Sequence, residues 1–275
     1  MQKILQITDC HLVPKGETIF GSDPHKRLVA AVADINREHA DASLCVVTGD
    51  LAHHGDPVAY SLLRETLDAL TVPYQLLPGN HDDRAALAAA FPVLARDPND
   101  FIQSVRDMPA GRFVFLDTVD AGVHSGFYCA DRQEWLRNIL AQDQDRPVYI
   151  FMHHPPFEIA FPKLDQYVLV NGDEFAKVVG RHPDVRHIFF GHVHRPVSGS
   201  WRGIPFSALR GTNHQNWLTF DSGRENVCSL EPPAYAVIFL DSETTVVHYH
   251  DFLDQNPRYV YDPDAAPELQ VRRIV

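Results

Sequence analysis

The sequence predicts an α/β fold in which two packed sheets are flanked by helices. Three observations favour this class. Through the first 190 residues, short apolar runs alternate with stretches of helical spacing, a pattern typical of parallel strands joined by helices. After residue 200 the pattern changes to short β-like pieces, which we expect to form a second sheet packed against a largely parallel first one. Because no internal repeat or low-complexity linker interrupts the 275 residues, one domain spanning 1–275 is the simplest prediction.

Each predicted strand is a short apolar run that ends at a turn signal. The first run, residues 3–8 (KILQIT), leads into Asp9, and the second, 44–47 (LCVV), leads into Gly49 and Asp50. Further strands are expected at 74–77, 112–117, 148–152 and 187–190. The later β-like pieces are 204–208, 217–220, 235–240 and 245–249.

The predicted helices carry apolar side chains at intervals of three and four residues. Residues 22–24 (SDP) supply a capping side chain and a proline for a first turn, and Leu28 and Val32 follow at helical spacing. The last 20 or so residues, about 250–275, contain several prolines and are predicted to form an irregular C-terminal arm. Further helices are expected at 57–70, 84–95, around 135–140 and at 173–181.

The composition disfavours several kinds of partner and location. The formal net charge of −12 argues against long nucleic acids, because their phosphate backbones are bound by clustered lysines and arginines. None of the four cysteines forms a CxxC pair, so a zinc ribbon is not indicated. With no leader pattern and no run of about 18 apolar residues, we expect a cytoplasmic protein without a membrane segment.

Polar residues with metal-binding side chains follow several of the predicted strands. Ligands of open α/β sheets bind at the carboxyl ends of the strands, so these residues are expected to meet at one rim. The motifs in chain order are Asp9-x-His11, Gly49-Asp50, Gly79-Asn80-His81-Asp82, His153 and Gly191-His192-x-His194.

The donor types favour a pair of transition-metal ions. Imidazole, carboxylate and carboxamide donors without a thiolate suit Mn, Fe, Co or Zn. In near-extended chain, residues i and i+2 point the same way, so Asp9 and His11 can reach one ion. His192 and His194 can do the same, or can serve adjacent ions if a turn lies there. Two ions about 3.5–4 Å apart clamp a phosphoryl group and generate hydroxide at neutral pH.

Each motif alone has a plainer explanation. An Asp-x-His pair is usually polar surface, Gly-Asp is a turn signal, and Gly-Asn-His-Asp or His153-His154-Pro155 can be an ordinary loop. The glycines at 49, 79 and 191 also fit sharp turns beside a crowded site. All the motifs occur in order at strand ends, and this favours the metal centre.

In this order the motifs resemble those of the calcineurin-like metallophosphoesterases, over residues 9–194. The chain carries these motifs in a short, undecorated form, and in this it is similar to the branch that includes class III cyclic nucleotide phosphodiesterases and bacterial glycerophosphodiesterases. The resemblance implies a four-layer α/β-β/α sandwich and two divalent or mixed-valence ions. It implies that one ion is held by Asp9, His11 and His194, that the other is held by Asn80, His153 and His192, and that Asp50 bridges both.

The activity that the resemblance implies is hydrolysis of small phosphodiesters, a cyclic nucleotide or a glycerophosphodiester, through attack of a metal-bound hydroxide. It places His81 against the phosphate or the leaving group. His214 is a second catalytic candidate, with an exposed loop histidine as the plainer alternative, and Asp82 is expected to orient a histidine. Two alternative enzyme functions, phosphomonoesterase and nuclease, remain open, since Arg84, Arg195 and Arg210 lie in nearby loops. A non-catalytic metal-binding scaffold is a third alternative.

Two segments, 53–60 and 155–172, are expected to wall the substrate pocket. The aromatic residues of the second segment can stack on a base or pack the loop, and packing is favoured; they are Phe157, Phe161 and Tyr167. A homo-oligomer, a dimer or a larger assembly, is an expectation that rests on the branch resembled. The apolar residues near the end of the chain can cover a partner, but we favour their completing the chain's own second sheet; they are Val237, Phe239, Val247, Tyr249 and Phe252.

Overall fold

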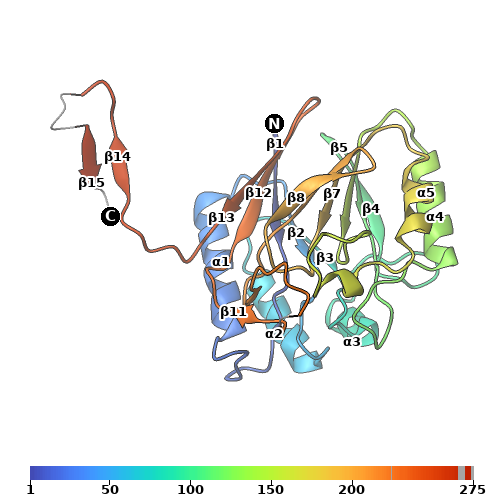
Figure 1. The fold of residues 1–275 in the computed structure, drawn as a ribbon, viewed down its shortest axis with the longest axis horizontal. Helices are drawn as coiled ribbons and strands as arrows, with labels where there is room; N and C mark the ends of the chain where they lie inside the picture. Colours follow the sequence, from blue (N-terminus) through green and yellow to red (C-terminus); the bar gives the residue numbers. More distant parts are fainter. Residues whose placement is uncertain (224, 266–269, 274–275) are drawn as a thin grey trace.

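The computed structural model describes residues 1–223, 225–265 and 270–273, and two mixed sheets form its centre (Figure 1). The first sheet has the strand order β13-β12-β1-β2-β3. Its strands are β1 (Gln2–Ile7), β2 (Leu44–Thr48), β3 (Tyr74–Leu77), β12 (Tyr235–Leu240) and β13 (Thr245–His250). The second sheet has the order β4-β5-β6-β7-β9-β8. Its strands are β4 (Ser104–Met108), β5 (Gly111–Phe115), β6 (Val148–Met152), β7 (Val185–Phe190), β8 (Val197–Trp201) and β9 (Ile204–Ala208).

Helices cover the outer face of each sheet. In Figure 1, α4 and α5 lie on one side of the two sheets and α1 lies on the other. The helices are α1 (Pro24–Glu38), α2 (Pro57–Leu67), α3 (Arg84–Ala90), α4 (Ala130–Ala141) and α5 (Gly172–Val179), with a short 3-10 turn at η1 (Asp165–Tyr167). As expected for the first helix, Asp23 caps it by accepting from the Lys26 amide at 3.1 Å, and Pro24 occupies the first turn.

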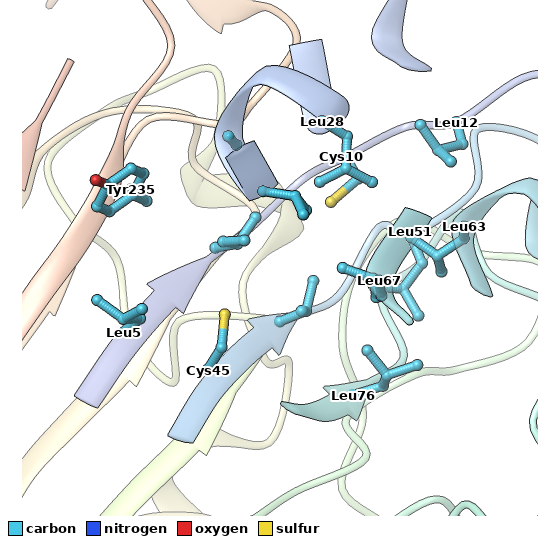
Figure 2. Packing of buried hydrophobic residues seen from close by; sticks show 14 of the residues in the cluster. Leu5, Cys10, Leu12, Leu28, Cys45, Leu51, Leu63, Leu67, Leu76 and Tyr235 are labelled. Carbon is cyan, nitrogen blue, oxygen red and sulfur yellow. The ribbon is translucent and has the colours of Figure 1, made fainter. Parts of the chain in front are cut away.

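Three buried layers hold these elements together, and they follow from the alternation of side chains along the strands. On β1, Ile4 points into the layer between the sheets, while Leu5 joins the layer beneath α1 and α2. Figure 2 shows the second of these layers, where Leu28 and Leu63 lie over the sheet together with the small buried thiol of Cys45. A third layer packs α4 and α5 on the other sheet. The predicted four-layer α/β-β/α sandwich is therefore confirmed.

The division of strands between the sheets differs from the prediction. The late strands β12 and β13 do not build a separate sheet. Instead β12 pairs antiparallel with β1, from Gln2–Leu240 to Gln6–Ala236 in register, and extends the first sheet. The core of the second sheet comes from β5, β6 and β7, with β8 and β9 added at one edge. Apolar runs identify strands, but they do not specify which free edge a distant strand will pair with.

Several local predictions were wrong for identifiable reasons. Strands β4 (SVRDM) and β8 (VSGSW) were not predicted because they are mostly exposed edge strands without an apolar run. The segment 217–220 is irregular rather than β, and Phe220 is 70% exposed there. The helix predicted for 84–95 ends at Ala90, because Pro92 disfavours helical geometry in the residue before it.

The C-terminal arm is not irregular throughout. After β13, an extended segment leads to a hairpin of β14 (Tyr259–Tyr261) and β15 (Val271–Arg273), which projects from the rest of the molecule (Figure 1). Val237 and Phe252 are buried against the chain's own helices, so these late apolar residues complete a sheet of this chain, although it is the first sheet and not the second. Among the described residues, no helix is long and apolar enough to cross a membrane.

The aromatic core between the sheets provides a test of the fold. Phe151 is fully buried, and its ring centroid lies 4.8 Å from that of Phe189 and 5.4 Å from that of Phe115. Phe151→Ala should lower the free energy of unfolding by about 3–5 kcal/mol in urea titrations, because it leaves a cavity in a close-packed layer. Val93→Ala is the control: Val93 is 96% exposed, so its loss should stay within about 0.5 kcal/mol. Equal losses would contradict this packing.

Candidate metal centre

The predicted ligands meet at one edge of the molecule, but they come from both sheets. Asp9 and His11 follow β1, and Asp50 follows β2. His153 and His192 follow β6 and β7 of the opposite sheet. The rim that the sequence predicted for a single sheet is therefore shared by two.

The first group of donors contains Asp9, His11 and His194. Nε2 of His194 lies 3.2 Å from Oδ1 of Asp9 and 3.2 Å from Nε2 of His11. All three side chains are almost completely buried, and their ligand atoms, with one from Asp50, lie within 4.8 Å of one another. Such close approach of several potential ligand atoms is expected at a site that binds a cation.

The second group of donors contains Asn80, His153 and His192. The amide oxygen of Asn80 lies 2.9 Å from Nδ1 of His192 and 3.2 Å from Nε2 of His153. Asp50 lies between the two groups, since its Oδ1 is 3.3 Å from Nε2 of His153 and its Oδ2 is 3.5 Å from Nε2 of His11. The two histidines of the Gly-His-x-His motif thus belong to different groups.

The backbone brings these side chains together through turns and not through extended chain. Five of the predicted ligands have positive φ: Asp9 (52°), His11 (47°), Asp50 (50°), His192 (69°) and His194 (50°). The expectation that Asp9 and His11 point the same way in extended chain was therefore wrong, whereas the alternative of a turn at His192 and His194 agrees with their positive φ. Left-handed geometry costs on the order of 1 kcal/mol or more per non-glycine residue, and such strain is concentrated at functional sites.

Backbone carbonyls orient two of the histidines. Nδ1 of His153 lies 2.7 Å from the Thr48 carbonyl, and Nδ1 of His194 lies 2.7 Å from the His214 carbonyl. A carbonyl only accepts, so each Nδ1 carries a hydrogen, and Nε2 is the nitrogen left to bind a cation when it is deprotonated. This is the arrangement by which metal-binding histidines are held. The donor set therefore fits divalent metal ions.

Glycine is required where the loops approach most closely. A Cβ on Gly79 would overlap the backbone amide and the carboxylate of Asp50, and would lie 2.8 Å from Cε1 of His153. A Cβ on Gly49 would lie 2.7 Å from Cγ of the same ring. The glycines therefore admit the ligands to the limited space between the loops, as the sequence analysis expected.

The charges of the site shift the pKa values of its histidines in opposite directions. Burial alone would lower the pKa of His153, but the adjacent Asp50 carboxylate raises it to about 9. Burial, together with the charge of His153, lowers the pKa of His192 to about 3. Burial would raise the pKa of Asp50, yet His153 and its neighbours hold it well below its usual range. The close contact with His153 is thus the main interaction that favours the ionised form of the Asp50 carboxylate.

Asp82 does not orient a histidine, contrary to the sequence-based expectation. Its carboxylate accepts from the amides of Leu51 (3.1 Å), Ala52 (3.0 Å) and Gly79 (2.8 Å) and from the Tyr60 hydroxyl (2.9 Å). Burial and the nearby Asp50 charge raise its pKa to about 6, while the backbone amides that donate to it favour the ionised form. Asp82 thereby ties the loop after β2 to the loop after β3.

The two catalytic candidates lie at the donor groups. His81 is partly exposed, and its Nε2 lies 4.0 Å from Oδ2 of Asp50. His214 is buried, so the alternative of an exposed loop histidine was wrong, and its ring centroid lies 4.5 Å from that of His194 and 4.9 Å from that of His11. A catalytic role for the His214 side chain stays a prediction.

Three further histidines at the site were not predicted as functional. His53 lies 3.1 Å from His11, Nδ1 to Nδ1, and stacks on His81. His154 is buried with its ring centroid 4.8 Å from that of His192. The exposed His124 places Nδ1 3.2 Å from the amide nitrogen of Asn80. His53 was included only as the start of a pocket wall. None of the three has a spacing that distinguishes it from a surface histidine.

The nearby arginines are engaged in ion pairs. Arg84 forms two hydrogen bonds with the buried Asp117, at 2.6 and 2.8 Å. Arg195 pairs with Glu231, and Arg210 lies 3.1 Å from Asp251. These pairings direct all three guanidinium groups to protein carboxylates.

The aromatic residues of segment 155–172 mostly pack the fold. Phe157 stacks on Trp201 with ring centroids 5.1 Å apart, and Phe161 is 2% exposed. Packing was the favoured expectation, and for these two residues it is confirmed. Tyr167 instead lies at the edge of His124, with ring centroids 5.8 Å apart.

The fold and the donor groups define a class of protein: an α/β sandwich with a metal site between the ends of its two sheets. The calcineurin-like phosphoesterase family model matches residues 2–196. The chain is 42% identical to a probable cyclic nucleotide phosphodiesterase of Rhodopseudomonas palustris, over 94% of this chain and 95% of the relative. It is 29% identical to a glycerophosphodiester phosphodiesterase of Enterobacter lignolyticus, over 98% of each.

A solved structure, a dimetal phosphatase from Danio rerio, shares the fold with a TM-score of 0.70 and 17% identity, over 92% of this chain and 97% of that one. The chain belongs to the calcineurin-like phosphoesterase family, as the motif resemblance predicted. Membership implies divalent metal ions, and the Asp and His cluster is able to bind them.

The role of Asp82 can be tested against its neighbour Asp83. Asp82→Ala leaves four donors without their shared acceptor and should lower the free energy of unfolding by about 3 kcal/mol or more. Asp83 caps α3 through the Ala86 amide, so Asp83→Ala should cost only about 1 kcal/mol. Urea unfolding of chelator-treated protein measures both without a metal contribution. Equal costs would show that Asp82 does not tie the loops together.

Proposed function

We propose that this protein is a dinuclear metal-dependent phosphodiesterase that hydrolyses small phosphodiesters. The observation that carries the proposal is the position of Asp50, whose two oxygens face donor groups from opposite sheets. A single buried carboxylate flanked in this way is suited to bridge two cations. The phosphodiesterase relatives, which match nearly the whole chain, support the same reaction class.

The proposed ligands divide as the donor groups do. Asp9, His11 and His194 would hold one ion, while Asn80, His153 and His192 would hold the other. Asp50 would bind both. Mn, Fe, Co or Zn suits this set of imidazole, carboxylate and carboxamide donors. Two such ions, when bound, neutralise charge on the phosphoryl oxygens and lower the pKa of a coordinated water.

His81 is proposed to move a proton to the leaving oxygen. Its Nδ1 lies 2.8 Å from the His53 carbonyl, so this nitrogen carries a hydrogen and donates it there. Its backbone amide donates to Oδ1 of Asp50 at 2.9 Å, which holds the ring at the edge of the donor groups. Nε2 is then the nitrogen left to face a substrate, and in the imidazolium form it carries a transferable proton.

The charges around the site favour a diester over a monoester. A diester carries one negative charge, whereas a monoester dianion is commonly bound by additional arginines. The arginines nearest the site in sequence are all paired with carboxylates of the chain, so they add no free positive charge for a dianion. With 42% identity to a probable cyclic nucleotide phosphodiesterase, a cyclic nucleotide is the first substrate class to test. The net charge of −12 argues against long nucleic acids.

A cytoplasmic location, assembly into a homo-oligomer and a single domain over 1–275 stay predictions. None of them is needed for the chemistry proposed above.

The reaction class and the bridging role can be tested together. Metal-supplemented wild-type protein should hydrolyse bis(p-nitrophenyl) phosphate faster than p-nitrophenyl phosphate, and chelation should abolish both activities. Asp50→Ala should lower bound metal, measured by elemental analysis, and should reduce turnover at least about 100-fold, because both groups of donors lose a shared ligand. Faster monoester hydrolysis would reject the diesterase. Two ions and full activity in Asp50→Ala would reject the bridge.

The role of His81 can be separated from metal binding. His81→Ala should keep two ions per chain while turnover of a cyclic nucleotide falls by about 10²–10⁴-fold, the usual contribution of a general acid. The loss should be smaller for bis(p-nitrophenyl) phosphate, because p-nitrophenolate leaves without protonation. His248→Ala, on the exposed side of β13, is the control and should match wild type. Loss of metal from His81→Ala would make His81 a ligand, and equal losses for both substrates would exclude proton donation.

A further inference from the structure

We infer that His53 is a positioning residue: its side chain fixes the tautomer of His11, and its backbone carbonyl fixes the ring of His81. The inference rests on the proposed function, because it takes His11 as a metal ligand and His81 as the proton donor. It concerns a residue for which no role was predicted beyond the wall of the pocket.

The backbone of His53 is held in a fixed place relative to His11. The chain segments beyond β1 and β2 continue to pair after the strands end, with the His11 amide donating to the Asp50 carbonyl at 2.8 Å. Leu12 and Ala52 form a parallel bridge, and the His53 amide donates to the Leu12 carbonyl at 2.9 Å. The two loops therefore form one rigid unit.

The ring contact determines where the protons lie. Nδ1 of His53 is 3.1 Å from Nδ1 of His11, while Nε2 of His11 faces Asp50 and His194. A neutral imidazole carries a hydrogen on only one nitrogen. To present an electron pair at Nε2, His11 must carry its hydrogen on Nδ1, and the Nδ1 of His53 must accept it. The proton of His53 then sits on its own Nε2.

The same residue also supports the proposed proton donor. The His53 carbonyl accepts from Nδ1 of His81 at 2.8 Å. The two rings are stacked, with centroids 5.0 Å apart and an interplanar angle of 15°. A substitution at position 53 that keeps the backbone should therefore release His11 but retain the carbonyl bond to His81, and this allows the two effects to be separated.

The first experiment compares three variants by titrating metal-depleted protein with Zn²⁺ against a competing chelator. His53→Ala should weaken one of the two ions by about 10–100-fold, as expected when the hydrogen-bond partner of a ligating histidine is lost. His53→Asn should recover most of the affinity, because its amide oxygen accepts a hydrogen bond in nearly the same place as Nδ1. His54→Ala is the matched control, since the exposed His54 touches the His53 ring and has no contact with His11; its affinities should stay within about twofold of wild type.

A second experiment needs no destabilising variant. Long-range ¹H–¹⁵N spectra of the zinc-loaded wild-type protein distinguish the two neutral tautomers of each histidine. The signals of His53 are assigned as those missing from His53→Asn. We expect His53 to carry its hydrogen on Nε2 and His11 to carry its hydrogen on Nδ1.

The outcomes separate the inference from the proposed function. Unchanged Zn²⁺ affinities in His53→Ala, equal weakening of both ions, no recovery in His53→Asn, or a hydrogen on Nδ1 of His53 would each overturn the positioning role. If wild-type protein binds only one ion, the dinuclear proposal is rejected. The Zn²⁺ affinities of the variants would still test whether His53 supports the ion held by His11. Wild-type protein that binds no Zn²⁺ would reject both.

Discussion

The Asp50 carboxylate contacts imidazoles from both sheets, so the site exists only where the two sheets are held in one relative position. His11 reaches it from the loop after β1, and His153 reaches it from the loop after β6. His153 lies two residues after Phe151, whose ring is stacked between Phe115 and Phe189 in the layer between the sheets. The aromatic core between the sheets therefore sets the spacing of the donor groups.

This arrangement is unfavourable for the chain without a cation. Asp9, Asp50 and four histidines are at most 8% exposed, and burying charged or unpaired polar groups costs several kcal/mol. Five of the predicted ligands also have left-handed backbone geometry. Because metal binds only the folded chain at such a site, binding free energy adds directly to folding stability. The Asp50 carboxylate raises the pKa of His153 to about 9, which favours a proton on this ring when no metal ion is bound.

The sequence predicted which side chains meet better than the way they converge. Short motifs at the ends of apolar runs picked out side chains that the structure brings together, because strand ends are local features that a run of residues such as 44–47 reveals. Sheet membership depends on which free edges meet, as with β12 beside β1, and this long-range choice leaves no local signal. Exposed edge strands such as β8 bury few side chains, so they carry no apolar run and also leave no local signal. The role of Asp82 was mistaken because the sequence cannot show that amides of two loops point at one carboxylate.

The polar groups around the donors suggest how the site selects its substrate. The guanidinium groups of Arg84, Arg195 and Arg210 are neutralised by carboxylates. Several of the described groups beside the donor atoms are imidazoles, among them those of His53, His81 and His214. Burial lowers the pKa of His53 to about 4, so its ring contributes hydrogen bonds and not charge. Divalent ions, when bound, would supply positive charge to a phosphate at this site. A singly charged diester requires fewer cationic partners than a dianion, and so it matches a site whose three nearby arginines are already paired with carboxylates.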